Sequence, residues 1–156
     1  MKKETQSIIR NLQNVLTGEP WYGRAVYKIL QEINPVIFYK KPNYNSHSHA
    51  ELLYHMITWS EFTLKQIEKA GKEEIEKIEG RDWIIIDPTI HTWQKGLEEL
   101  KSIHEKIIAL LQLKDDEWLK EKVNFRDFNN RFLLNGLIQH NIYHIGQIAY
   151  LKKQLD

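Results

Sequence analysis

Two histidines near the carboxyl end of the chain, His140 and His144, have a spacing that suits chemistry. Residues four apart lie on successive turns of one helix face, about 5–6 Å apart at Cβ, so both imidazoles could reach one metal ion. The face is otherwise apolar and should point into a core, where an imidazole without a polar partner costs free energy. Its residues, at steps of three and four, are Leu133, Leu137, His140, His144, Ile148 and Leu151.

A third histidine, His55, occupies a similar position on another predicted helix. Ser48, followed three residues later by Glu51, is a capping-box pattern and predicts a helix start. The inward stripe that follows comprises Leu52, His55, Trp59 and Phe62. Any one histidine could be a core residue bonded to a carbonyl or a carboxylate, but the coincidence of three favours a metal site. We therefore predict that His55, His140 and His144 bind a divalent metal ion and leave at least one coordination position open.

Other polar residues are weaker candidates for the chemistry. Glu51 lies one turn before His55 and could accept a hydrogen bond from it or act as a base, although its capping role already explains it. Gln147 could orient a ligand. His104 lies on the stripe of a further helix and could complete or border the site, but the pattern does not fix its depth, so we interpret it as a core or rim histidine. Asn141 stands where the H-E-x-x-H motif of zincin proteases has its glutamate, which excludes that class. Three histidines near helix beginnings are expected to be solvated: His47, His49 and His91.

The apolar periodicity predicts four long helices and a shorter one. The expected ranges are 3–16, 20–33, 48–71, 89–111 and 131–155. Residues 20–33 could form the shorter helix or continue the first one after a kink, and residues 72–79 could extend the helix 48–71 by a turn or two. Residues 80–87 contain three consecutive isoleucines, but no second strand exists to pair with them, so we expect a packed loop. The connections at 34–47 and 112–130 are long enough to cross an end of a bundle. The pattern thus predicts an all-α protein, a four-helix bundle with long crossover loops, in a single domain spanning residues 1–156.

Composition excludes several classes of partner and chemistry. The 22 Lys and Arg residues nearly balance the 21 Asp and Glu residues, so the chain has no global field to attract nucleic acid or an anionic membrane, and we expect neither as a partner. The absence of cysteine excludes disulfides, thiolate zinc sites and a cysteine nucleophile. No stretch approaches the ~20 apolar residues of a membrane span and the start lacks the apolar run of a signal peptide, so a cytoplasmic location is expected.

The stretch HNIYHIGQIAYL from His140 to Leu151 resembles the H-x-x-Y-H-x-G-Q motif that closes the bundle in the DinB/YfiT-like superfamily. AELLYHMITWSEF resembles the family's second helix, and EPWYGRAVYKIL is similar to the Trp-containing segment before it. The resemblance implies a four-helix bundle and a metal site, commonly zinc or nickel, whose three histidines fall on His55, His140 and His144. Members include S-transferases that use bacillithiol or mycothiol, a mycothiol-dependent isomerase and proteins described as metal-dependent hydrolases, and homodimers are common among them.

These observations favour a metal-dependent enzyme acting on a small-molecule substrate. The leading hypothesis is an S-transferase that uses a low-molecular-weight thiol of the bacillithiol kind, because coordination to a metal ion lowers the pKa of a thiol and supplies thiolate near neutral pH. One alternative is a hydrolase, in which the same ion lowers the pKa of bound water. The other alternative is a stress-related protein that binds metal without catalysis. Zinc or nickel is the expected ion, with iron or copper also compatible with three imidazoles.

Overall fold

The structure, a computed structural model, describes all residues from 1 to 156, and its regular secondary structure is helical apart from one isolated β-bridge. The α-helices are α1 (Lys3–Thr17), α2 (Val26–Gln31), α3 (His49–Ile67), α4 (Lys72–Glu79), α5 (Trp93–Leu111) and α6 (Asn130–Leu155). Two short 3-10 helices, η1 (Pro35–Ile37) and η2 (Trp118–Lys120), lie in the long connections. The predicted all-α class is therefore confirmed.

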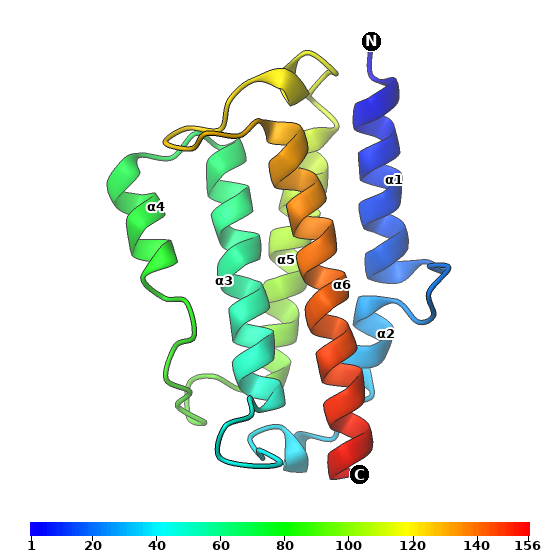
Figure 1. Cartoon of the computed structure of the whole chain (residues 1–156), viewed down its shortest axis with the longest axis vertical. Coiled ribbons are helices and arrows are strands. Elements are labelled where there is room, and N and C mark those ends of the chain that lie inside the picture. Colours follow the sequence, from blue (N-terminus) through cyan, green and yellow to red (C-terminus); the bar gives the residue numbers. More distant parts are fainter.

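The four longest helices form the bundle (Figure 1). Helix α3 packs against both α5 and α6, and α1 packs against α6 and α5. The short α2 lies beside α6 below the end of α1, and α4 lies on the outer side of α3 (Figure 1). The bundle thus consists of α1, α3, α5 and α6, and the predicted four-helix architecture is confirmed.

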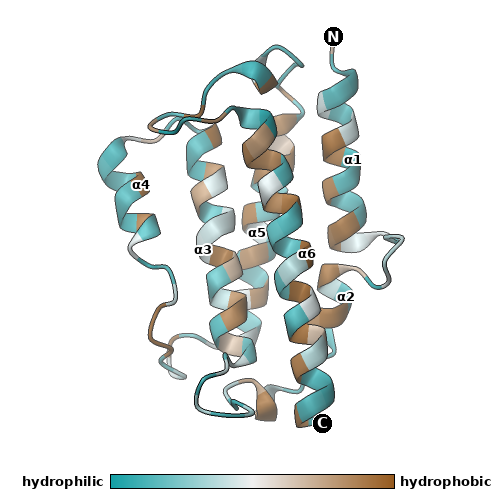
Figure 2. Cartoon of the chain, in the orientation of Figure 1, coloured by the Kyte–Doolittle hydropathy of each residue, from teal (hydrophilic) through white to brown (hydrophobic).

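Amphipathic patterning explains how these helices associate. Apolar and polar residues alternate along each long helix with a helical period (Figure 2), and the apolar sides meet in one cluster of 32 buried residues. Leu53 and Met56 of α3, Leu100 of α5 and Leu134 of α6 are among its fully buried members. Apolar burial at this interface holds α3 and α6 side by side, and that pairing positions the candidate site.

The helix starts follow the capping chemistry of the sequence, with one shift. The capping box at α3 forms as expected, because the Glu51 amide donates to Ser48 Oγ at 3.1 Å and the Ser48 amide donates to Glu51 Oε2 at 2.7 Å. The next long helix starts at Trp93, capped by Thr92, and not near residue 89. Asp87 accounts for the difference, since its carboxylate accepts both the amide and the hydroxyl of Thr89 and stabilises a turn instead of a helix.

Three further local expectations have mixed outcomes. The predicted helix 48–71 ends at Ile67, and Gly71, at the end of the predicted range, is the N-cap of the separate helix α4. The prediction that His49 is solvated was wrong, because the residue is 1% exposed and its Nε2 lies 3.3 Å from the carbonyl oxygen of Ile148. The segment 80–87 does form a loop, in which Ile84 and Ile86 pack on the core and the isoleucine between them is exposed.

The connection 112–130 crosses one end of the bundle and the segment 32–48 crosses the other (Figure 1). The first of these contributes to a second, smaller apolar cluster that joins α3, α4, the connection and α6. Its buried members are Phe62, Ile75, Ile78, Val123 and Leu133. No helix is long and apolar enough to cross a membrane.

Candidate metal centre

The three histidines singled out in the sequence come together between α3 and α6. One ring nitrogen from each of His55, His140 and His144 lies within 4.8 Å of the other two. The ring centroids are 4.3 Å apart for His140 and His144, and 4.9 and 4.5 Å from that of His55. His55 and His144 are buried and His140 is half-buried. The convergence is a property of the structure, whereas the role of these rings as metal ligands stays a prediction.

Two of the rings are oriented by acceptors on their outer side. Asp82, in the loop after α4, accepts a hydrogen bond from Nδ1 of His55 at 2.7 Å. Gln147 follows His144 by three residues on α6, and its Oε1 lies 2.6 Å from Nδ1 of His144. A carboxylate only accepts, and the amide oxygen does the same, so the Nδ1 atoms carry the protons and the Nε2 lone pairs face the shared space. Such outer partners are typical of histidines that bind metal ions.

The rings are held in the neutral form that coordination requires. Burial lowers the pKa of His140 to about 3, and the neighbouring His144 and His55 act in the same direction. Burial also lowers the pKa of His55, against the opposing effect of Asp82. The pKa of His144 is lowered by burial as well, although the hydrogen bond to Gln147 opposes this. At neutral pH all three imidazoles are therefore able to donate a lone pair.

The geometry fits a bound cation. Nε2 of His140 lies 3.0 Å from Nε2 of His55, and two lone-pair nitrogens approach that closely only when a proton or a cation lies between them. Nitrogens that share a tetrahedral zinc ion are about 3.3 Å apart, and the three ring nitrogens here lie within 4.8 Å of one another, so the widest pair has to approach by up to about 1.5 Å to complete such a set. His140 lacks the outer acceptor that the other two rings have, because its Nδ1 is buried without a hydrogen-bond partner. The three-histidine group could thus hold a divalent metal ion.

Aromatic side chains cover one side of the cluster. Trp83 stacks on His55 with ring centroids 3.8 Å apart and an interplanar angle of 10°, and His47 stacks on the other face of the same indole at 3.8 Å. Trp83 has a φ of 51°, a left-handed conformation that is rare for a bulky residue. Trp59 donates its indole N–H to Asp82 at 3.0 Å. Sequence patterns did not point to Asp82 or Trp83, because both lie in a loop without a motif.

The weaker sequence candidates lie in different places. Glu51 is committed to the capping box and to Lys41, whose Nζ lies 2.7 Å from its carboxylate, and it is not part of the cluster. Gln147 contacts the outer nitrogen of His144 and does not lie between the three rings. His104 is 1% exposed and belongs to a separate hydrogen-bonded group with Tyr27, Ser60 and Asn141.

A comparison with solved structures identifies the same fold in another protein. The crystal structure of the colibactin self-resistance protein ClbS in complex with a double-stranded DNA matches 96% of this chain and 95% of its own, with a TM-score of 0.69 and 16% identical residues. For this chain the likeness establishes the fold. The DNA bound to ClbS contradicts the expectation that excluded nucleic acid as a partner, because that expectation rested on net charge alone, and a balanced net charge does not report on local basic patches.

A comparison with curated proteins finds no match. The family model of the DinB superfamily, in contrast, matches residues 23–148, which include all three clustered histidines and most of the bundle. The chain therefore belongs to the DinB superfamily.

Proposed function

We propose that this protein is a divalent-metal enzyme in which His55, His140 and His144 are the ligands and zinc or nickel is the ion. We further propose that it transfers a small thiol of the bacillithiol kind to an electrophile. The observation that carries the proposal is the convergence of three neutral imidazoles, with ring nitrogens within 4.8 Å of one another, in a chain of the DinB superfamily. Three nitrogen ligands leave room for a substrate heteroatom at the ion.

The chain's own residues have defined tasks in this proposal. Asp82 and Gln147 hold two rings with their Nε2 lone pairs inward, and Trp83 stacks on His55 and limits its access to water. A bound divalent cation would lower the pKa of a coordinated thiol and supply thiolate near neutral pH. The protein has no cysteine, so the thiol has to come from a separate molecule.

The test combines metal analysis with a conjugation assay. Protein purified without an affinity tag should contain about one equivalent of metal, and with metal it should accelerate the reaction of a small thiol with 1-chloro-2,4-dinitrobenzene. His140→Ala should lose both properties while its circular dichroism spectrum stays helical. Full metal content in His140→Ala would contradict the ligand assignment. Metal-dependent hydrolysis of esters or amides without any thiol-dependent product would replace transfer with hydrolysis, and metal binding without turnover would indicate a non-catalytic protein.

A second candidate function is contact with duplex DNA. The ClbS complex raises it, and the start of α1 supplies a basic surface, because Lys2, Lys3, Gln6 and Arg10 line one surface hollow that contains no carboxylate. Binding through phosphates should weaken steeply with salt. A short fluorescent duplex should therefore bind at low ionic strength, and the double variant Lys3→Glu, Arg10→Glu should bind it at least about 10-fold more weakly. No binding at low salt would remove this candidate.

A further inference from the structure

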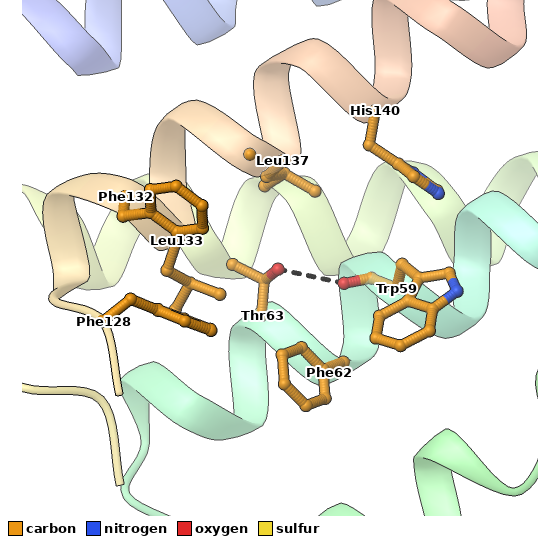
Figure 3. A pocket seen from close by; sticks show the side chains of 9 residues that line it. Trp59, Phe62, Thr63, Phe128, Phe132, Leu133, Leu137 and His140 are labelled. Carbon is orange, nitrogen blue, oxygen red and sulfur yellow. Dashed lines mark hydrogen bonds between the residues drawn. The ribbon is translucent and has the colours of Figure 1, made fainter. Parts of the chain in front are cut away.

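An apolar cavity of about 170 Å³ lies beside His140, between α3 and the first half of α6 (Figure 3). Six of its nine lining residues are apolar: Trp59, Phe62, Phe128, Phe132, Leu133 and Leu137. The cavity comes from the same helix pair that supplies the three histidines, together with the connection that crosses the end of the bundle. Its position next to a candidate ligand makes it part of the surroundings of the site.

The cavity wall offers almost no hydrogen bonds. The hydroxyl of Thr63 donates to the backbone oxygen of Trp59 at 2.9 Å (Figure 3), and the indole N–H of Trp59 donates to Asp82. Gly136 has no side chain to contribute. The remaining polar group is the imidazole of His140 at one end of the cavity. A polar ligand would lose its hydrogen bonds to water in this space, whereas an apolar group would gain from burial.

The volume limits what can enter. Apolar cavities of about 150 Å³ lined by aliphatic and aromatic side chains bind benzene. A cavity of about 170 Å³ therefore fits one six-membered ring or a branched alkyl group of similar size. Larger fused ring systems would have to extend through the mouth, where Phe132 is 63% exposed.

Two residues connect the cavity to the histidine cluster. His140 belongs to both. Trp59 forms part of the cavity wall, lies with its ring centroid 6.5 Å from that of His140 at an interplanar angle of 63°, and donates to the carboxylate that orients His55. An apolar group in the cavity and a heteroatom at the cluster are close enough to belong to one small molecule.

We propose that this cavity receives a single aromatic ring, or an alkyl group of equal size, from a substrate whose heteroatom binds at the three-histidine site. The assignment rests on the proposed metal-dependent function and narrows its substrates to compounds of the benzyl class. Gly136 sets the size of the accepted group, because a Cβ at this position would meet no atom within 4 Å and a longer side chain there would extend into the cavity.

The experiment has one arm without metal and one with zinc. In the first, toluene is added to the metal-free protein, and nuclear Overhauser effects are sought between its ring and the methyl groups of Thr63, Leu133 and Leu137. In the second, calorimetry compares phenylmethanethiol with ethanethiol on the zinc-loaded protein. We expect the toluene contacts, and we expect phenylmethanethiol to bind on the order of 10- to 100-fold more tightly than ethanethiol.

Two glycine variants on α6 provide the matched comparison. Gly136→Leu should fill the cavity, remove the toluene contacts and reduce the preference for phenylmethanethiol to about 3-fold or less, with zinc stoichiometry and ethanethiol affinity unchanged. Leucine is the better helix former, so the variant should fold. Gly146→Leu is the control, because a Cβ there also meets no atom within 4 Å but the residue does not line the cavity. This variant should keep the preference.

The outcomes separate the two proposals. Equal binding of the two thiols to the zinc-loaded protein, or a preference that survives Gly136→Leu, would overturn the assignment of the cavity and leave the metal-dependent function standing. Absence of toluene contacts would likewise overturn the cavity as an apolar subsite. Failure of the wild-type protein to bind either zinc or nickel would overturn the proposed function and, with it, the link between the cavity and an ion.

Discussion

His104 and the three clustered histidines are buried in the same bundle, but the atoms around their rings differ. Both nitrogens of His104 have partners on neighbouring helices, since the Tyr27 hydroxyl lies 2.5 Å from Nδ1 and the Ser60 hydroxyl 3.1 Å from Nε2. The amide of Asn141 adds a third contact at 3.3 Å. In the cluster, by contrast, the hydrogen-bond acceptors lie on the outer side and the inner nitrogens face one another.

This difference teaches that burial alone does not identify a metal ligand. The pKa of His104 and that of His140 are both lowered to about 3, chiefly by burial. What separates them is whether the inward lone pair already has a donor. The hydroxyls and the amide around His104 satisfy the ring, whereas the inner nitrogens of the cluster need a shared proton or a cation. A buried ring whose nitrogens all have hydrogen-bond partners stabilises the fold, whereas buried ring nitrogens without such partners favour the binding of a ligand.

The largest expected effect is a loss of zinc binding that only the cluster can show. His140→Gln removes one of three ligands and should weaken zinc binding at least about 100-fold, whereas His104→Gln should retain one equivalent at wild-type affinity. Competition with a chromophoric chelator measures both variants, and circular dichroism checks that both remain helical. Wild-type zinc affinity in His140→Gln, or loss of zinc from His104→Gln, would abolish the distinction between the two regions.

The second effect concerns the stability of the metal-free protein, and here the larger loss is expected for the His104 variant and the smaller one for the His140 variant. His104→Ala leaves the buried Ser60 and Tyr27 hydroxyls without their partner and opens a cavity, so it should lower the free energy of unfolding by about 2–4 kcal/mol. His140→Ala should cost less than about 1 kcal/mol, because its ring is half-buried and its Nδ1 has no hydrogen-bond partner to lose. Urea denaturation monitored by circular dichroism measures both values, and equal costs would contradict the comparison.

Periodicity and capping predict much of the fold and the position of the clustered histidines. Steps of three and four place His55, His140 and His144 on inward faces, and the capping box fixes the start of α3. The depth of His104 could not be predicted, because a stripe indicates direction and not which polar partners the adjacent helices supply. Asp82 could not be predicted either, since its contact with His55 depends on how the loop after α4 returns to α3.

The loop also explains the shifted start of α5. Local side-chain hydrogen bonds at Asp87 prevail over a periodic pattern that continues through residues 89–92. The exclusion of nucleic acid rested on net charge. Net charge is a sum over the whole chain, and it does not indicate how 22 basic and 21 acidic side chains are distributed over the surface.

A third prediction concerns the outer partners of the cluster. Asp82→Asn replaces a pure acceptor with a weaker one that can also donate, so His55 would lose the fixed proton on Nδ1. Zinc affinity should fall about 10- to 100-fold. Gln147→Ala should have a smaller effect, because an uncharged acceptor orients His144. The ¹⁵N shifts of the ring nitrogens report the tautomers directly, and an Asp82→Asn protein with unchanged His55 shifts and unchanged zinc affinity would show that Asp82 has no positioning role.

The smallest effect is a pH dependence that the two regions share. The pKa values of His104 and His140 are about 3 in the folded protein, below the ordinary 6.5 expected after unfolding. Between these values the unfolded chain binds protons that the folded chain does not, so the free energy of unfolding of the metal-free protein should fall as the pH drops below about 6.5. Each histidine contributes at most about 1.4 kcal/mol per pH unit.

The window from pH 6.5 to 5.5 reports chiefly on histidines, because the ordinary pKa values of Asp and Glu, about 4, lie below it and those of Glu4 and Glu51 are lowered further. His104→Gln and His140→Gln should each flatten the slope over this window by a similar amount. Zinc separates the two regions, because protons compete with the ion for the cluster but not for His104. Zinc-loaded wild-type protein should therefore lose metal on acidification, and His104→Gln should lose it over the same pH range. A shift of that range in His104→Gln would mean that the ring of His104 is coupled to the ion.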